Sequence, residues 1–278
     1  MNTDDIIRLA IAEDIGNGDH TSLATIPSES LGKAQLKAKE DGILAGIFIA
    51  EKVFKTIDPS IIFTPFKTDG QTIAIGDIIF SVEGKSISIL SAERLALNFM
   101  QRMSGIATFT RLLVDKIKGT SAKLLDTRKT TPLLRGLEKY AVKVGGGENH
   151  RFGLYDMIMI KDNHIDFAGG IKNAIEATHS YLKKKGLVLK IEVEVRNFNE
   201  LQQVLNHGGV NRIMLDNFSP LDLKKAIELI NGKYESEASG GINLQTIRSF
   251  AETGVDYISV GALTHQIKSL DLSLIAVK

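Results

Sequence analysis

Cationic side chains are concentrated in one stretch of the sequence, DTRKTTPLLRGLEKYAVKVGGGENHR at 126–151. It contains six Lys or Arg against three acids, with a histidine beside the last arginine. Arginine offers a planar fork to carboxylates and phosphates, whereas lysine acts as a point charge. Arg128 and Lys129 follow a predicted strand, where adjacent side chains diverge, so we expect them to meet two different anionic ligands. Arg151 is predicted to be a third ligand-binding cation.

Other polar residues of this region have competing interpretations. Lys139 and Lys143 suit a solvated helix face with i,i+4 pairing. Lys161 ends the apolar segment DMIMIK, so it faces either a ligand or an acid, and we favour the ligand. His164 has no HExxH or comparable spacing that would support a metal site. The remaining lone histidines considered are interpreted as structural: His20, His179 and His207.

Acidic side chains at two predicted strands suggest a divalent cation site. Glu192 and Glu194 lie on one face of the segment IEVEV, because side chains alternate along a strand. Asp216 falls at the corresponding end of the next segment, RIMLDN. Carboxylates at neighbouring strand ends hold Mg²⁺, with waters and substrate phosphates completing its shell. The alternative is that these acids form salt bridges with Lys190 or Arg196.

Glycine follows the last two predicted strands. The segments EASGGI at 237–242 and SVGALTH at 259–265 run from a strand through glycine toward a helix, which in the first case should begin near Asn243. Glycine lets the backbone approach a ligand, and a helix N-terminus favours negative charge. We therefore predict that a phosphorylated small molecule binds here. Neither GxxxxGK[ST] nor GxGxxG occurs, which disfavours nucleoside triphosphate and dinucleotide folds.

These residues sit on a repeated strand-then-helix pattern in the second half of the chain. Six strands are predicted, namely AKLLDT, DMIMIK, KIEVEV, RIMLDN, YESEAS and DYISVG. Such alternation implies parallel strands, hence an α/β barrel or a doubly wound sheet. We favour a barrel, smaller than eight strands or incomplete, because the candidate residues lie at the strand ends that form the active-site rim of barrels. Those rim positions are Asp126, Lys161, Glu194, Asp216, Glu237 with Ser239, and Gly261.

The first half of the chain has the pattern of a small α+β unit. A helix is expected over residues 4–12, capped by Asn2 or Thr3. A hairpin at 83–85 should join the strands GDIIFSVEG and KSISIL. A long, largely buried helix is predicted to follow from Ser91 to residue 118.

The change of pattern indicates two domains. We place an α+β domain at 1–108 and an α/β barrel domain at 109–266. The tail 267–278 lacks a partner strand nearby, so we expect it to pack back on the first domain.

Composition excludes several classes of protein. Lys plus Arg number 34 and Asp plus Glu 33, so the formal charge of +1 supplies no broad basic field for nucleic acid. The absence of cysteine excludes disulfides, thiolate nucleophiles and cysteine-based metal sites. The acidic start and the lack of a long apolar run predict neither a signal peptide nor a membrane span, so we expect a cytoplasmic protein.

Ten motifs in order resemble the quinolinate phosphoribosyltransferase family: EDIGNGDHT, DGILAG, ERLALNFMQRMSGIAT, DTRKTTP, EKYAVKVGGGENHR, IKDNH, EVEV, LDN, EASGGI and SVGALTH. The resemblance implies an α+β sandwich domain followed by a seven-stranded α/β barrel, assembled as a homodimer. It implies an enzyme of NAD biosynthesis that converts quinolinate and phosphoribosyl pyrophosphate, with Mg²⁺, into nicotinate mononucleotide, pyrophosphate and CO₂.

The resemblance also assigns roles to residues. Three are implied to be catalytic: Arg128, Lys129 and Lys161. Quinolinate binding falls to Arg128, His150, Arg151 and Lys161, with Arg94 completing the neighbouring subunit's site. The sugar diphosphate and its metal are implied to lie at Lys129, Glu194 and Asp216, and the 5′-phosphate at Ser239, Gly240, Gly241, Gly261 and His265. One departure is Leu133, where the family often has glycine.

Three alternatives are weighed against this assignment. A Schiff-base lyase would use Lys161 as its nucleophile. A non-catalytic sensor would bind phosphoribosyl pyrophosphate without releasing CO₂. A related phosphoribosyltransferase would act on another aromatic acid with the same fold and phosphate site. The number of cations expected at the substrate favours a dicarboxylate over nicotinate.

Overall fold

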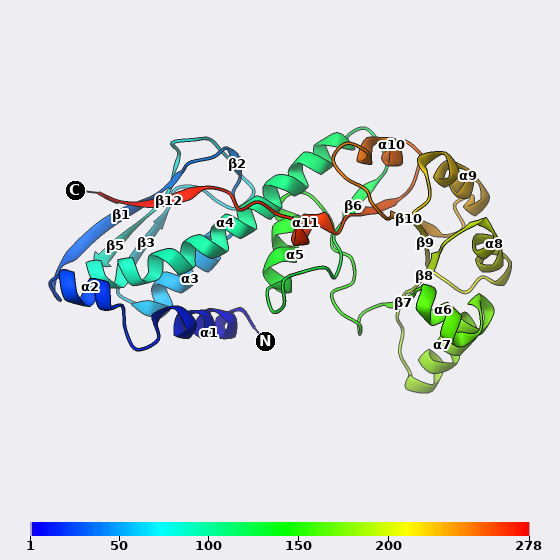
Figure 1. Ribbon diagram of the computed structural model, residues 1–278, viewed down its shortest axis with the longest axis horizontal. Coiled ribbons are helices and arrows are strands. Elements are labelled where there is room, and N and C mark those ends of the chain that lie inside the picture. The colour runs from blue at the N-terminus through cyan, green and yellow to red at the C-terminus, as the bar shows by residue number, and fades with distance from the viewer. Residues whose placement is uncertain (1, 278) are drawn as a thin grey trace. The chain divides into compact units, whose positions relative to one another are not determined.

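The chain is divided into two compact units in the computed structural model, which describes residues 2–277 (Figure 1). The first unit contains the chain up to Arg111, the segment Thr130–Gly146 and the chain from Leu263. The second contains Leu112–Lys129 and Gly147–Ala262. The boundary drawn at residue 108 falls inside one continuous helix, and the segment Thr130–Gly146, which the sequence pattern places in the second domain, clusters with the first unit.

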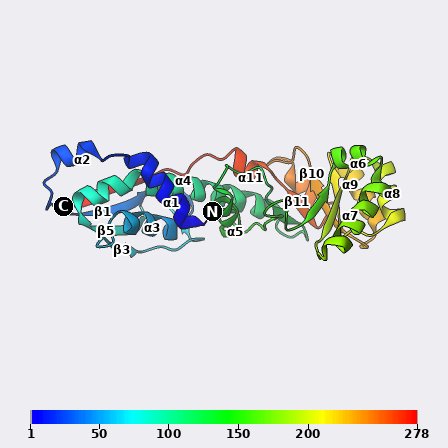
Figure 2. The same ribbon diagram turned by 90° about the horizontal axis from the view of Figure 1, so that it is seen from below.

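The first unit is built on an antiparallel sheet in the order β12-β1-β5-β3, with a small β2-β4 pair. The last strand, β12, pairs along β1, so the end of the chain returns to this unit. Helix α1 packs against α3 (Figure 2). The elements of this part are α1 (Thr3–Ile15), α2 (His20–Thr25), β1 (Leu31–Ala38), β2 (Gly42–Ile43), α3 (Ile47–Ile57), β3 (Ile62–Pro65), β4 (Thr72–Ile73), β5 (Ile78–Lys85), α4 (Ser86–Lys116), α5 (Arg135–Val144), α11 (Ala262–His265) and β12 (Leu272–Val277).

The opening helix forms for the reason that the sequence indicates. The Asn2 side chain accepts a hydrogen bond from the main-chain N–H of Asp5, and the Asp5 carboxylate accepts one from the main chain of Asn2. This reciprocal pair satisfies two N–H groups that helix geometry leaves without partners. The predicted helix at 4–12 is therefore confirmed, with Asn2 as its cap.

The predicted hairpin at 83–85 is wrong. Strand β5 passes directly into α4, so KSISIL forms its last residue and the first helical turns. Alternating serine and isoleucine imitates a strand, but the hydroxyls find partners that a helix can reach. Ser86 Oγ lies 3.1 Å from Ser30 Oγ, and Ser88 Oγ donates to Asp58 at 2.9 Å. Tertiary contacts thus override the weak β preference of β-branched residues.

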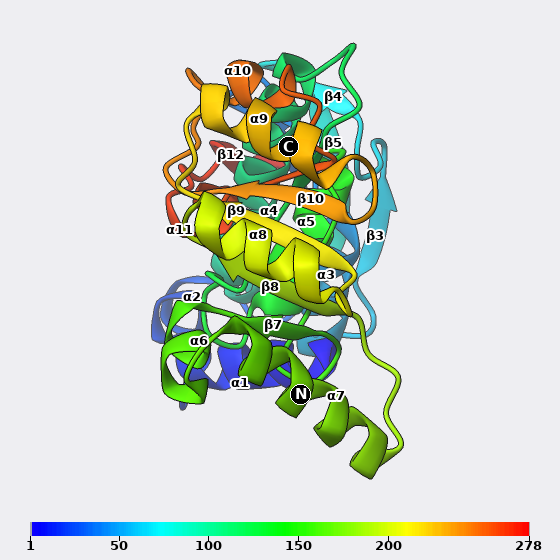
Figure 3. The same ribbon diagram turned by 90° about the vertical axis from the view of Figure 1, so that its right-hand side faces the viewer.

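The second unit contains all six predicted strands in one parallel sheet, in the order β6-β11-β10-β9-β8-β7. A further parallel bridge joins Leu125 to Glu148. Figure 3 shows α8 and α9 lying across the outer side of β8, β9 and β10. The elements are β6 (Lys123–Leu125), β7 (Ile158–Ile160), α6 (Asp162–Ala168), α7 (Ile171–Lys185), β8 (Ile191–Val195), α8 (Phe198–His207), β9 (Arg212–Asp216), α9 (Pro220–Ile230), β10 (Glu235–Ser239), α10 (Ile247–Ala251) and β11 (Tyr257–Ser259).

The strands place acids inside this unit. Every residue of β8 is buried, with Ile191, Val193 and Val195 on one face and two glutamates, Glu192 and Glu194, on the other. The prediction of parallel strands with helical crossovers is confirmed, and polar side chains gather on the face opposite the helices. None of the helices within residues 2–277 has the length and apolar character needed to cross a membrane.

Candidate active site

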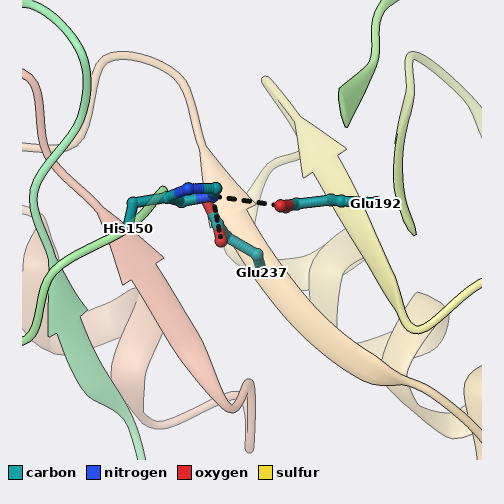
Figure 4. A group of neighbouring side chains, drawn as sticks. All are labelled: His150, Glu192 and Glu237. Atoms are coloured by element: carbon teal, nitrogen blue, oxygen red, sulfur yellow. Dashed lines mark ion pairs between the residues drawn. The ribbon is translucent and has the colours of Figure 1, made fainter. Parts of the chain in front are cut away.

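A buried imidazole lies between two carboxylates inside the second unit (Figure 4). His150 Nε2 is 3.0 Å from Glu192 Oε2 and 3.3 Å from Glu237 Oε2. Both glutamates are 0% exposed, and they come from strands β8 and β10. Glu192 was expected on the same strand face as Glu194, and Glu237 at the end of its strand. Glu237 instead lies in the middle of β10, so the prediction that it faces the rim is wrong.

A buried arginine completes this cluster. Arg212, at the start of β9, donates to Glu237 at 2.9 Å and to Glu235 at 2.9 Å. Its guanidinium carbon lies 3.9 Å from the centre of the Tyr257 ring, a cation–π arrangement. One ligand atom from each of His150, Glu192 and Glu237 lies within 4.8 Å of the others, as in some metal sites. The positive charge of Arg212 already offsets the negative charge of Glu192 and Glu237. We therefore assign no metal here.

The proton on the imidazole is located by its neighbours. Burial lowers the pKa of His150, but hydrogen bonds to Glu192 and Glu237 outweigh burial and raise that pKa to about 9. The main-chain N–H of Arg151 points at Nδ1 at 2.6 Å. In the neutral ring Nδ1 accepts from this N–H, so the single proton lies on Nε2 and faces the two carboxylates, whereas the charged ring carries a proton on both nitrogens. Burial and the charge of Glu237 raise the pKa of Glu192 to about 7.

The loop that carries His150 is anchored by Asp126. The main-chain N–H of His150 donates to Asp126 Oδ1 at 2.8 Å, and Asn149 Nδ2 donates to Asp126 Oδ2 at 2.6 Å. Asp126 is completely buried. It was predicted as a rim residue, but it holds the GGGENHR segment in place and is not open to a ligand.

Two arginines act on each other electrostatically in this part of the second unit. Arg151 is partly buried and donates to the carbonyl of Met157 at 3.2 Å. Burial, followed by the positive charge of Arg128, lowers the pKa of Arg151. Arg128 itself is exposed just after the end of β6, as is Lys129. Two cations that repel each other favour a negatively charged ligand in their vicinity.

Lys161 pairs with an acid. Its Nζ lies 2.7 Å from Glu194 Oε2, although a ligand was favoured over this alternative. The ammonium group has three donors, so the pair leaves it able to meet a ligand as well. The salt-bridge partners suggested for Glu194 are wrong, because Lys190 pairs with Glu235, and Arg196 with Asp166 and Glu200.

Asp216 and the glycine loop after β10 lie next to each other. Asp216 pairs in register with Ser239, and the main-chain N–H of Asn217 donates to the carbonyl of Ser239 at 2.9 Å. Gly240 has φ +100°, and a Cβ there would clash with Asn217 Oδ1. Glycine is thus needed for this close approach. Gly241, at φ +61°, is exposed, and the space that a Cβ would occupy there is open, with no heavy atom of residues 2–277 within 4 Å apart from its chain neighbours.

The helix after the first glycine loop differs from the prediction. Helix α10 begins at Ile247, four residues after Asn243, and is five residues long. Helix α11 follows Gly261 directly, as the pattern predicts, and has four residues. The contribution of these short helices to phosphate binding stays a prediction, beside that of the glycine-loop backbone.

Other residues singled out in the sequence lie in the first unit. Arg94 is exposed on α4, and His265 is exposed at the end of α11. Their roles beside residues of the second unit stay predictions. Lys139 was expected on a solvated face, but it is 3% exposed, whereas Lys143 is exposed as predicted. Leu133 has φ +67°, a left-handed conformation in which glycine is unstrained.

Sequence reasoning missed the role of Arg212. A charged residue at the start of an otherwise apolar strand is a weak signal that it needs a buried partner. The register supplies those partners, because Arg212 lies opposite Glu192 on β8 and opposite Glu235 on β10. That pairing could not be read from the sequence alone.

Comparisons with known proteins agree along the chain. Models of the N-terminal and C-terminal domains of quinolinate phosphoribosyl transferase match residues 19–104 and 106–275. A chloroplastic carboxylating nicotinate-nucleotide pyrophosphorylase of Arabidopsis thaliana is 48% identical over 284 residues, covering 97% of this chain and 81% of its own. A probable carboxylating enzyme of the same name from Bacillus subtilis is 44% identical, covering 94% and 89%. The crystal structure of NadC from Streptococcus pyogenes matches with a TM-score of 0.93 at 41% identity, covering 99% of this chain and 97% of that one.

Proposed function

The chain belongs to the quinolinate phosphoribosyltransferase family, and we propose how its own residues carry out the family's reaction. It is a phosphoribosyltransferase that acts on quinolinate with decarboxylation and produces nicotinate mononucleotide in NAD biosynthesis. The observation that carries the residue-level proposal is the electrostatic effect of Arg128 on Arg151, whose pKa it lowers together with burial. Quinolinate has two carboxylates, and each can accept a charge-assisted hydrogen bond from one guanidinium.

Lys161 completes the quinolinate end of the site in this proposal. Its ammonium group, already beside Glu194, is a point charge for the carboxylate that stays on the ring. The two arginines hold the ring against rotation while bonds change. Holding the dianion in one orientation lowers the entropic barrier to attack of the ring nitrogen on the ribose.

The sugar diphosphate lies on the other side of the strand ends. Lys129, exposed and next to Arg128 in the chain, is assigned to the pyrophosphate. We assign the 5′-phosphate to the loops that contain Ser239, Gly240, Gly241 and Gly261, with His265. The open space at Gly241 and the close backbone approach at Gly240 support this assignment.

Glu194 and Asp216 fit a magnesium ion. Glu194 pairs in register with Met214, two residues before Asp216, so both carboxylates lie on one face of neighbouring strands. Carboxylate oxygens are ligands that Mg²⁺ prefers, with waters and substrate phosphates completing the shell. Bound Mg²⁺ supplies positive charge that neutralises the pyrophosphate leaving group.

The reaction needs positioning and electrostatics more than a strong base. The bond from ribose C1′ to the pyrophosphate oxygen breaks, pyrophosphate keeps the electron pair, and the pyridine nitrogen forms the new bond to C1′. Lys129 stabilises the departing charge. The carboxylate next to the ring nitrogen then leaves as CO₂, its electron pair stays on the pyridinium carbon, and a proton from solvent replaces it. Arg128, Arg151 and Lys161 hold the ring through both steps.

The second part of the proposal concerns assembly. We assign a homodimer in which exposed Arg94 of one subunit completes the site of the other. This assignment is supported by the resemblance of SAERLALN to the family motif and by the exposure of Arg94 on α4. A cytoplasmic location is likewise kept as a prediction, supported by the absence of cysteine.

Family membership sets aside the lyase and the sensor as main functions. The alternative of a related transferase with another aromatic acid is tested directly by measuring ¹⁴CO₂ from carboxyl-labelled quinolinate. We expect release only when phosphoribosyl pyrophosphate and Mg²⁺ are present, in equal amount to nicotinate mononucleotide. Release without the sugar diphosphate, or equal transfer to nicotinate, would contradict the proposed function.

A further inference from the structure

Both ring nitrogens of His150 are engaged by the protein itself. Nε2 faces Glu192 and Glu237 at 3.0 and 3.3 Å, and Nδ1 faces the main-chain N–H of Arg151 at 2.6 Å. The side chain is 4% exposed. A ring that is fixed in this way offers no nitrogen to a ligand, so His150 does not match the role of direct quinolinate ligand that the family resemblance gives it.

The same contacts connect His150 to Arg151, which the proposed function assigns to quinolinate. Arg151 is held at two points, by its main-chain N–H on His150 Nδ1 and by its guanidinium on the carbonyl of Met157. The imidazole therefore sets the main-chain position from which the Arg151 side chain extends. A shift of the ring would move the guanidinium, and misplacement by about 1 Å of a substrate-holding group is costly.

The carboxylates behind the ring fix its orientation. If the imidazole were flipped, a carbon would face each of the two buried acids, and their ion pairs with Nε2 would be lost. Arg212 holds Glu237 from the far side at 2.9 Å, and β8 and β10 each have a neighbouring strand on both sides. The acids thus form a rigid backing for His150.

Their charge also acts on the arginine pair. Arg128 and Arg151 repel each other when no ligand is bound, and that repulsion opposes a preformed site. Glu192 attracts Arg151 through a buried region of low dielectric constant. The buried acid therefore offsets part of the cost of holding two guanidinium groups together.

We propose that Glu192 and Glu237 are positioning residues for quinolinate, acting through His150 on Arg151. The inference rests on the proposed function, because it takes Arg151 as a quinolinate ligand. It adds residues that touch no substrate, and it makes His150 a positioning residue as well.

The test compares binding of the two substrates in the full chain. Glu192→Gln and Glu237→Gln remove charge while preserving shape, and quinolinate binding is measured by calorimetry without the second substrate. We expect each variant to weaken quinolinate binding at least fivefold. Binding of phosphoribosyl pyrophosphate with Mg²⁺ should stay within twofold, because the pair acts on Arg151 and not on Lys129.

Glu200→Gln is the matched control. Glu200 is also a buried acid of the second unit in an ion pair with an arginine, Arg196, but it lies on α8, away from His150. Removing the charge of Glu200 should leave the quinolinate affinity within twofold of that of the unmodified chain. Since a buried substitution can impair folding, each variant is first compared by its unfolding midpoint, and either single glutamine variant that folds carries the test.

Two results would overturn the inference. One is a folded variant whose quinolinate affinity equals that of the unmodified chain. The other is an equal loss of affinity for both substrates, which would indicate a general structural role. Failure of the unmodified chain to bind quinolinate at all would instead contradict the proposed function, so the two failures are distinguishable.

Discussion

At the scale of single residues, the buried pair of carboxylates determines the charge state of His150. The pKa of His150 is raised from 6.5 to about 9. Between these two pH values, the folded chain therefore keeps a proton on His150 that the unfolded chain releases. The pKa of Glu192 is also raised, to about 7, and acts in the same direction. Many surface carboxyls have lowered pKa values, such as Asp19 and Asp58, but these groups titrate at lower pH.

The first prediction is a loss of stability between pH 6.5 and 9. A raised native pKa gives stability that is fully present below the unfolded value and is lost as pH rises through the folded value. We expect the free energy of unfolding to fall by up to about 3 kcal/mol over this interval. Denaturant titrations at several pH values measure it. In His150→Gln, the free energy of unfolding should change much less with pH. An unchanged pH dependence in that variant would refute the assignment of this effect to His150.

The second prediction concerns Leu133. Its φ of +67° costs an L-residue roughly 1 kcal/mol or more, and the residue is 65% exposed, so little packing offsets the strain. Leu133→Gly should raise the free energy of unfolding by about 1 kcal/mol. Leu133→Ala keeps the Cβ and the strain, and it should give no such gain. Equal stabilisation by both substitutions, measured in denaturant titrations, would show that strain is not the cause.

At the scale of elements, the loops after β9 and β10 are interlocked. Gly240 lies against the Asn217 side chain, and the Asn217 main chain donates to Ser239. The approach of two strand ends thus depends on one missing side chain. It also places Asp216 beside the glycine loop that we assign to the 5′-phosphate.

The third prediction separates contact from strain in this loop. Gly240→Ala introduces both a clash with Asn217 and an unfavourable φ, so we expect a loss of about 2–4 kcal/mol in the free energy of unfolding. Gly241→Ala introduces the unfavourable φ alone, because nothing lies within 4 Å. It should lose about 1 kcal/mol. Thermal unfolding of both variants measures the difference, and equal losses would contradict the role given to Asn217.

The elements also show where sequence reasoning succeeds. Long-range alternation of strands and helices predicted the six strands of the second unit, because strand-length segments recur between helical segments along the chain. Local patterns were less informative. KSISIL alternates like a strand and forms helix, because Ser86 and Ser88 find distant partners. Tertiary contacts of that kind are absent from a local pattern.

The site was likewise only partly predictable, because alternation along a strand can be read from the sequence but contacts between distant segments cannot. Period-two alternation correctly put Glu192 and Glu194 on one face. It could not say that the first of these lies deep in the sheet and the second near the strand end, since depth depends on how neighbouring strands are staggered. The coupling of His150 to Glu237 requires residues from a loop and a distant strand to meet, and only the folded register shows it.

At the scale of the whole molecule, the proposed sharing of a site between subunits makes the fourth prediction. Arg94→Ala and Lys161→Ala should each be inactive. When they are mixed and allowed to exchange subunits, one of the two sites in each hybrid has both residues intact, so activity should return partially. Mass spectrometry of labelled subunits establishes exchange. Continued inactivity after demonstrated exchange would contradict a shared site.

The central claim is that two guanidinium groups clasp the dicarboxylate, and the fifth prediction tests it most directly. Quinolinate binding is measured by calorimetry for Arg128→Ala, with Lys143→Ala, an exposed cation of the same basic segment, as the control. We predict that Arg128→Ala weakens binding about 100-fold, since a charge-assisted bidentate contact is lost, and leaves the unfolding midpoint nearly unchanged. The control should bind normally. Quinolinate affinity in Arg128→Ala equal to that of the control would contradict the account.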